Sequence, residues 1–122
     1  DYIVGIATQG ALATEGKVKA AQFFRILKLD ESIFDGNGKQ SAAILKDGKI
    51  VSFSSDKEIQ YQDKNVTFTV KSSSQQAEIF VNEKNECRNR QGVNVVVYDK
   101  RLGKVIHSVS FNAFDNYAIM TE

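Results

Sequence analysis

The sequence predicts an α+β domain in which a mostly antiparallel sheet, or a sandwich of two sheets, carries one principal helix. Apolar and polar residues alternate over much of the chain after residue 40, which is typical of strands. A single stretch near the N-terminus instead repeats its apolar residues every three or four positions. The 122 residues, 42% of them hydrophobic and 25% charged, are expected to form one domain, residues 1–122.

The helix is expected over residues 15–28. Thr14 is a natural N-cap, because its hydroxyl can accept a hydrogen bond from a backbone N–H of the first turn. The apolar residues of this segment form a broad face that can pack on a sheet: Val18, Ala20, Ala21, Phe23, Phe24 and Leu27.

Strands are expected at seven places, most of them joined by hairpin-length loops: residues 2–7, 41–45, 50–54, 66–70, 77–82, 93–99 and 105–111. The pair Asp47-Gly48 between two apolar runs is the strongest hairpin signal. Residues 93–99 are nearly continuous in apolar side chains, which predicts a central strand covered on both faces. In the last strand, alternate residues from Val105 through His107 to Phe111 are expected on one side.

Composition argues against several partners. The 16 basic and 15 acidic side chains leave a net charge of +1, which supplies no field to attract nucleic acid. No apolar run approaches the roughly 20 residues of a membrane span, so we expect a soluble chain without membrane insertion. Cys87 is the single cysteine and has no partner for an intramolecular disulfide.

The sequence contains no persuasive catalytic or metal-binding pattern. We interpret Cys87 as a loop thiol and His107 as a strand residue at the core margin, rather than as nucleophile and base. The carboxylates lack the spacing of metal ligands, and the Gly36–Lys39 turn lacks the frame of a phosphate loop. We therefore expect no enzyme, no metal and no cofactor.

Basic residues gather between positions 84 and 104: Lys84, Arg88, Arg90, Lys100, Arg101 and Lys104. Arginine offers paired donors that suit carboxylates, phosphates and sugar hydroxyls. The loops at residues 88–91 and 99–104 are therefore the first candidates for contact with a ligand or partner. Solvated loops beside a hydrophobic strand would have the same composition.

Residues 77–117 contain a pattern of known type. The pattern begins with a strand ending in Val-Asn and continues with the run Gln-Gly-Val-Asn-Val-Val-Val. A turn closed by glycine and the motif Phe-x-x-Phe-Asp-x-Tyr follow. They resemble the first half of the interleukin-like EMT inducer or PANDER family, whose module is also the glycan-binding stem (GG) domain of protein O-mannose N-acetylglucosaminyltransferase. The residues that carry the match are Gly92, Asn94, Gly103, Phe114, Asp115 and Tyr117.

The two halves of the chain resemble the family's halves in reverse order. Residues 57–122 resemble the N-terminal half, and residues 1–56 resemble the C-terminal half through a strand, a helix and a Ser-x-Ala strand. Either the module is a circularly permuted GG-type domain, or the chain is cut from an array of tandem modules. If the halves pair as in the family, residues 2–7 and 93–99 share one sheet, and the helix packs across it through Phe23 or Phe24 and Leu27.

The resemblance implies a non-catalytic, carbohydrate-binding-like recognition module of a larger surface, secreted or virion-associated protein. Its partner would be a glycan or another protein, and its location extracellular, on the cell surface or on a virion. The family's glycan pocket maps to Gln91, to Gln9 or Gly10, and to Lys39, with Arg90 one place from the mapped basic position. The candidate ligand-binding residues are Lys39, Arg88, Arg90 and Gln91.

The alternative function is a structural or connector domain that mediates protein–protein assembly, as in a phage fibre or a bacterial surface array. The absence of tryptophan, the favoured stacking surface for sugars, favours this alternative.

Overall fold

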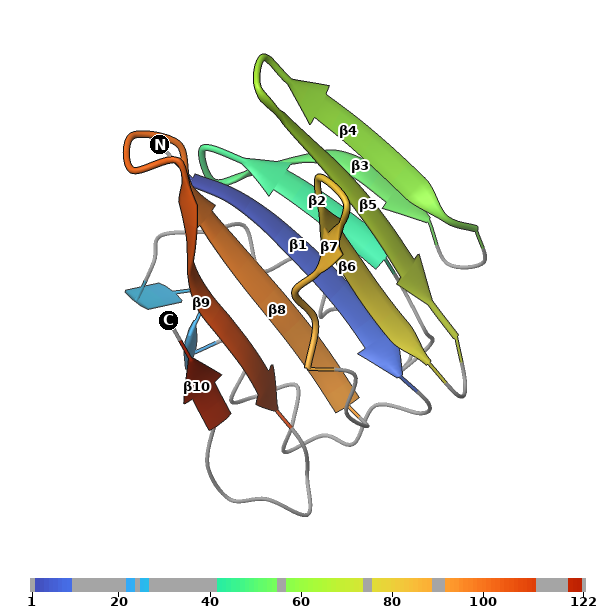
Figure 1. Cartoon of the computed structure of the whole chain (residues 1–122). Helices are drawn as coiled ribbons and strands as arrows, with labels where there is room; N and C mark the ends of the chain where they lie inside the picture. The colour runs from blue at the N-terminus through green and yellow to red at the C-terminus, as the bar shows by residue number, and fades with distance from the viewer. Residues whose placement is uncertain are drawn as a thin grey trace.

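Two antiparallel sheets lie face to face in the computed structural model of the chain (Figure 1). The structure describes residues 2–9, 22–23, 25–26, 42–54, 57–73, 76–88, 92–111 and 119–121. Its strands are β1 (Tyr2–Gln9), β2 (Ala42–Lys46), β3 (Lys49–Ser54), β4 (Ile59–Asp63), β5 (Val66–Ser72), β6 (Ala77–Val81), β7 (Lys84–Asn85), β8 (Gly92–Asp99), β9 (Lys104–Phe111) and β10 (Ile119–Thr121). The six-stranded sheet has the order β10-β9-β8-β1-β2-β3, and the four-stranded sheet has the order β4-β5-β6-β7.

The chain crosses between the two sheets twice. It leaves the six-stranded sheet after β3 and returns to it at β8, where β8 pairs with β1. This antiparallel pair runs from Tyr2 opposite Asp99 to Gln9 opposite Gly92. The expectation that residues 2–7 and 93–99 share a sheet is therefore confirmed, and so is the two-sheet sandwich.

The strands β1, β2 and β8 of the six-stranded sheet are buried on both faces, and each face has its own apolar cluster. The inner cluster, between the sheets, includes Ile3, Ile44, Phe68, Val70, Ile79 and Val96. The outer cluster, on the opposite face, includes Val4, Ile6, Leu45, Val93, Val95, Val97, Val109 and Phe111. Because successive strand residues point to opposite faces, a strand covered on both sides shows a continuous apolar run. This confirms the prediction of a central strand at 93–99.

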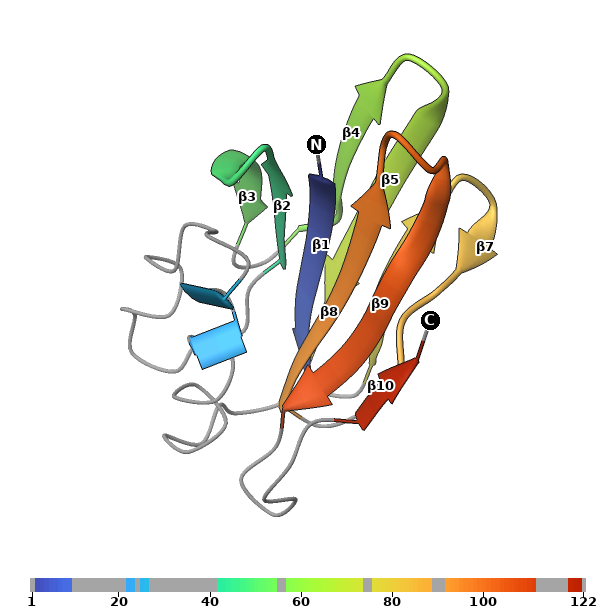
Figure 2. The same ribbon diagram turned by 90° about the vertical axis from the view of Figure 1, so that its left-hand side faces the viewer.

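Helical backbone is present at residues 22–23 and 25–26, and the rest of the helix expected over 15–28 lies outside the described residues. Phe23 packs against the outer cluster, with its ring centroid 5.4 Å from that of Phe111. Figure 2 shows these helical residues in light blue on one side of the six-stranded sheet, with β5 and β7 on the other. Packing through Phe23 is thus confirmed, whereas Phe24 and Leu27 lie outside the described residues.

The predicted Asp47-Gly48 hairpin turn is confirmed. Both residues have positive φ, 51° and 87°, as a two-residue turn of type I′ requires. β2 and β3 pair on either side of this turn, with Lys46 opposite Lys49.

Three motif residues of the family resemblance have identifiable structural roles. Gly92 and Gly103 have φ values of 104° and 65°, which other L-residues adopt with strain. Asn94 is buried, and its amide Nδ2 donates a hydrogen bond to the Ala7 carbonyl oxygen at 3.3 Å. These roles account physically for the residue types. Phe114, Asp115 and Tyr117 lie outside the described residues.

The expectation for the last strand is wrong at one position. Tyr98 pairs with Val105 and Val97 pairs with His107, which leaves Ile106 as an extra residue in β9. The resulting bulge turns Val105 into the inner cluster, while Ile106 packs against the outer one. Strict alternation from Phe111 back to Val105 therefore fails at the bulge.

Three short or half-buried strands were not expected: β4, β7 and β10. In β4, Ile59 and Tyr61 are half-buried while Gln60 and Gln62 are exposed. β4 lies at an edge of the four-stranded sheet, where two apolar residues suffice to cover one face. So few apolar residues give a weak sequence signal.

Candidate functional site

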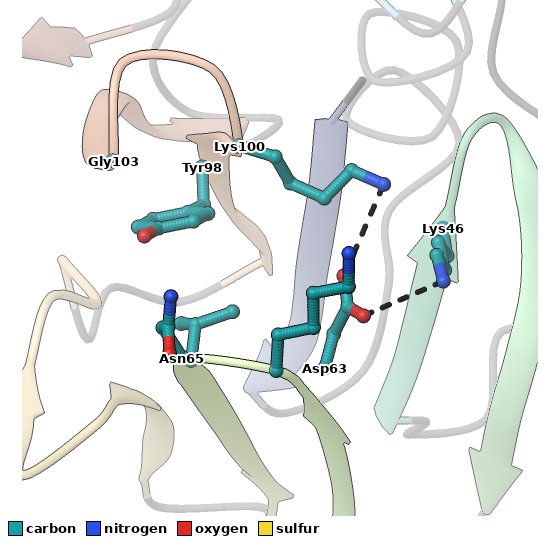
Figure 3. Close-up of a pocket in the computed structure, with 8 residues that line it drawn as sticks. Lys46, Asp63, Asn65, Tyr98, Lys100 and Gly103 are labelled. Carbon is teal, nitrogen blue, oxygen red and sulfur yellow. Dashed lines mark ion pairs between the residues drawn. The ribbon is translucent and has the colours of Figure 1, made fainter.

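A cleft of about 480 Å³ opens at the end of the sandwich where hairpin turns from both sheets meet (Figure 3). The six-stranded sheet contributes the ends of β2 and β8 and the β8–β9 turn, and the four-stranded sheet contributes the β4–β5 turn. The residues that line it are Lys46, Asp63, Lys64, Asn65, Val66, Tyr98, Lys100 and Gly103.

Ion pairs link the turns across the two sheets. The Lys46 Nζ lies 3.5 Å from Asp63 Oδ1, and the Lys100 Nζ lies 3.9 Å from Asp63 Oδ2 and 3.5 Å from Asp47 Oδ2. Charges therefore alternate from Lys46 through Asp63 and Lys100 to Asp47. Because these side chains are partly exposed, each pair adds little to stability, and the chain of charges chiefly positions the side chains.

The surroundings of this chain of charges shift two pKa values. The pKa of Lys46 is raised, first by its hydrogen bond with Tyr61 and then by the negative charge of Asp63. The pKa of Asp47 is lowered: partial desolvation raises it, but nearby donors and positive charges, Lys100 among them, more than offset that effect. Both side chains are therefore charged at neutral pH.

Asp99 organises the β8–β9 turn at the rim of the cleft. This residue is buried, and its Oδ1 accepts hydrogen bonds from the backbone N–H groups of Arg101, at 2.9 Å, and Leu102, at 3.3 Å. The Gly103 N–H donates to the Asp99 carbonyl oxygen at 2.8 Å and closes the turn. These bonds fix the positions of Tyr98 and Lys100 on either side of Asp99.

The cleft has an uncharged side and a charged side. Tyr98 and Asn65 lie on one side in Figure 3, and the ion pairs of Lys46, Asp63 and Lys100 lie on the other. The Tyr98 ring packs edge-on against Phe68, with centroids 6.1 Å apart, which holds the ring at the mouth of the inner cluster. The site thus combines an aromatic ring, an amide, ammonium groups and a carboxylate.

These groups can form hydrogen bonds with a bound ligand. The ammonium and amide groups donate hydrogen bonds, and the carboxylate and amide oxygens accept them. None of the described lining residues carries a thiol, imidazole or aliphatic hydroxyl. Within the described ranges, no group of three or more His, Cys, Asp or Glu side chains could hold a metal ion.

Three of the four predicted ligand-binding residues, Lys39, Arg90 and Gln91, lie outside the described residues, as does the Gly36–Lys39 turn. Their convergence into a pocket stays a prediction. Arg88 is described and half-buried, and its Nε donates a long hydrogen bond of 3.4 Å to the Ser108 carbonyl oxygen.

The described members of the basic cluster do not form one patch. Lys100, Arg101 and Lys104 belong to the β8–β9 hairpin, whereas Arg88 lies beside Ser108, which pairs with Val96 farther along the sheet. Lys100 is the member that lines the cleft.

Cys87 and His107 lie on opposite faces of the six-stranded sheet. Cys87 packs against the inner cluster, while the His107 ring lies edge-on to Phe23 on the outer side, with centroids 6.0 Å apart. The six-stranded sheet separates the two side chains, so they cannot act as nucleophile and base. The His107 Nδ1 is buried and has no hydrogen-bond partner among the described residues.

Sequence analysis missed most of the cleft, although a signal for it exists. Each of three turns carries an adjacent lysine and aspartate: Lys46-Asp47, Asp63-Lys64 and Asp99-Lys100. Each pair by itself is an ordinary polar turn. Only the order of strands in the two sheets brings the three turns to the same end.

The chain forms a two-sheet β-sandwich with a mixed-charge cleft at one end. No protein-family model matches this chain, and no curated protein and no solved structure matches it either. The resemblance to the PANDER family therefore stays a prediction from sequence motifs. No helix in the described part of the chain has the length and apolar character needed to cross a membrane.

Proposed function

We propose that this domain is a non-catalytic recognition module that binds glycan chains in the cleft between the β4–β5 and β8–β9 turns. The observation that carries the proposal is the pairing of Tyr98 and Asn65 on one side with lysine and aspartate side chains on the other. Sugars present apolar C–H faces, which pack on aromatic rings, and hydroxyl groups, which bond to amide and charged side chains. Turns held on a rigid sandwich are a common location for such sites.

The family resemblance supports glycan binding but implies a different location, around Lys39, Arg88, Arg90 and Gln91. The two locations are distinguishable because the cleft uses none of these residues. We place the ligand in the cleft, since its lining groups come together within the described structure.

A glycan array tests the proposal with the wild-type domain and three variants. Asn65→Ala removes an exposed amide from the cleft and is expected to weaken binding about 10-fold without lowering the melting temperature. Lys71→Ala, on the exposed face of β5, is the control and should bind like wild type. Arg90→Ala tests the competing location. Absence of binding to every glycan would contradict the proposal. If Arg90→Ala alone lost binding, the glycan site would lie around Arg90 and not in the cleft.

The alternative, a connector domain, is favoured by exposed apolar side chains on β3. Val51 and Phe53 are 42% and 52% exposed, and β3 is an edge strand of the six-stranded sheet. An edge strand with apolar side chains is suited to pair with a strand of a neighbouring copy in an array. Sedimentation velocity would detect this as association that grows with concentration and disappears in Phe53→Lys. A monomer at every concentration would argue against assembly through β3.

A further inference from the structure

We propose that the cleft binds an acidic glycan and that Lys64 is the residue that contacts its carboxylate or sulfate group. This inference rests on the proposed glycan-binding function and specifies the class of glycan. Two features of Lys64 carry it: its charge has no ion-pair partner among the described residues, and its backbone conformation is unusual.

The charge balance leaves Lys64 uncompensated. Lys46 and Lys100 each form an ion pair with Asp63, and Lys100 forms a second one with Asp47. Lys64 adds a further positive charge to the lining, and no ion pair or hydrogen bond of its side chain to another described residue is present. An anionic group on the ligand would complete the balance.

The backbone of Lys64 lies in a region that lysine seldom occupies. The described non-glycine residues with positive φ are Asp47, Lys64 and Asn82, at 51°, 44° and 58°. Aspartate and asparagine tolerate this region because their short polar side chains bond to nearby backbone. Lysine has no such compensation, and residues strained in this way occur preferentially at functional sites.

Asn65, the next residue, would suit the left-handed position better than lysine. The chain nevertheless places lysine at 64, where its side chain reaches the cleft, and asparagine at 65. We expect this order of the two residues to lower stability, because lysine occupies the left-handed position. A requirement for the ammonium group of Lys64 in ligand binding would explain why lysine occupies this position.

The uncharged side of the cleft favours a sugar over an acidic peptide as the carrier of the anionic group. Tyr98 offers a ring and Asn65 an amide on the side away from the ion pairs, so one pyranose could contact both while its acidic substituent meets Lys64. A carboxylated and a sulfated sugar meet this requirement equally.

The experiment combines binding and stability measurements on Lys64→Asn. This variant removes the charge and places a residue that tolerates positive φ at 64. Isothermal titration calorimetry would use a heparin oligosaccharide, a hyaluronan oligosaccharide, a neutral maltooligosaccharide and poly-glutamate. We expect at least one acidic glycan to bind the wild type and to bind Lys64→Asn about 10-fold or more weakly. The melting temperature should rise by about 2 to 4 °C, because strain is relieved.

Lys71→Gln is the matched control, because it removes one lysine charge from the exposed face of β5 and should leave affinity unchanged. A preference for heparin assigns a sulfate, and a preference for hyaluronan assigns a carboxylate. Binding of the neutral glycan with equal affinity in Lys64→Asn would overturn this inference and leave the proposed function standing. Tighter binding of poly-glutamate than of any glycan would overturn the choice of a sugar. Absence of binding to all glycans would overturn both proposals.

Discussion

Gly5 in β1 lies directly against Ile79 in β6. A methyl group on Gly5 would be 2.6 Å from the Ile79 Cγ2, which is far inside normal contact, and 3.2 Å from the Phe68 Cδ2, which is a tight contact. β1 is a central strand of the six-stranded sheet, so this glycine is the place where the four-stranded sheet approaches its backbone most tightly among the described glycines. The close packing of the two sheets therefore depends on the absence of a side chain at position 5.

Gly5→Ala is expected to destabilise the domain by about 1 to 3 kcal/mol, because the sheets must separate or Ile79 must leave its rotamer. Urea denaturation measures the loss. The double variant Gly5→Ala/Ile79→Ala should lose less stability than the sum of the two single variants, since the second change removes the clash. Additive losses would show that the two residues are not in contact.

Val95→Ala and Val97→Ala are each expected to cost about 1 to 3 kcal/mol, because both side chains are at most 1% exposed in the outer cluster. Lys71→Ala, on the exposed side of β5, should change stability by less than about 0.5 kcal/mol. Chemical denaturation of the three variants gives the comparison. Equal effects would mean that the buried and exposed faces are assigned wrongly.

Asp99→Ala is expected to destabilise the β8–β9 turn by about 1 to 3 kcal/mol, because the N–H groups of Arg101 and Leu102 lose their acceptor. Asp99→Asn keeps one acceptor oxygen and should cost less. Thermal melts of both variants measure the difference. Equal melting temperatures of the two variants would show that the Asp99 side-chain oxygen does not stabilise the turn.

The charges at the cleft make a small part of the stability dependent on pH. The pKa of Asp47 is lowered in the folded state, so its contribution is present above the usual aspartate value of about 4 and is lost as pH falls through the folded value. The pKa of Lys46 is raised, so its contribution is present at neutral pH and is lost as pH rises through the folded value.

Urea midpoints measured from neutral to acid pH test the acid side of this dependence. The wild type should lose slightly more stability on acidification than Asp47→Asn, because the variant lacks the titrating carboxyl group. If the urea midpoints of the wild type and Asp47→Asn fall in parallel down to the lowest pH, the charge of Asp47 contributes nothing to stability.

Local features of the chain could be predicted well from sequence. The Asp47-Gly48 turn and the doubly buried run at 93–97 depend on interactions between near neighbours and on the period of side-chain direction. The bulge at Ile106 could not be predicted, because an extra residue interrupts that period without changing composition. β4 was missed because its apolar signal rests on Ile59 and Tyr61 alone.

Local sequence patterns predicted the antiparallel strands and the position of the central strands, because side-chain direction alternates along a strand. They also predicted an α+β domain with one principal helix, whereas the described residues are mostly strand, with helix at residues 22–23 and 25–26. Which turn residues meet in the cleft depends on the tertiary structure. Lys46, Lys64 and Lys100 lie in three turns separated by many residues, and each is an ordinary polar turn residue in its own segment. They share a cleft because the two sheets pack face to face with the ends of β2 and β8 beside the β4–β5 turn, and contacts between distant segments of this kind leave no local sequence signal.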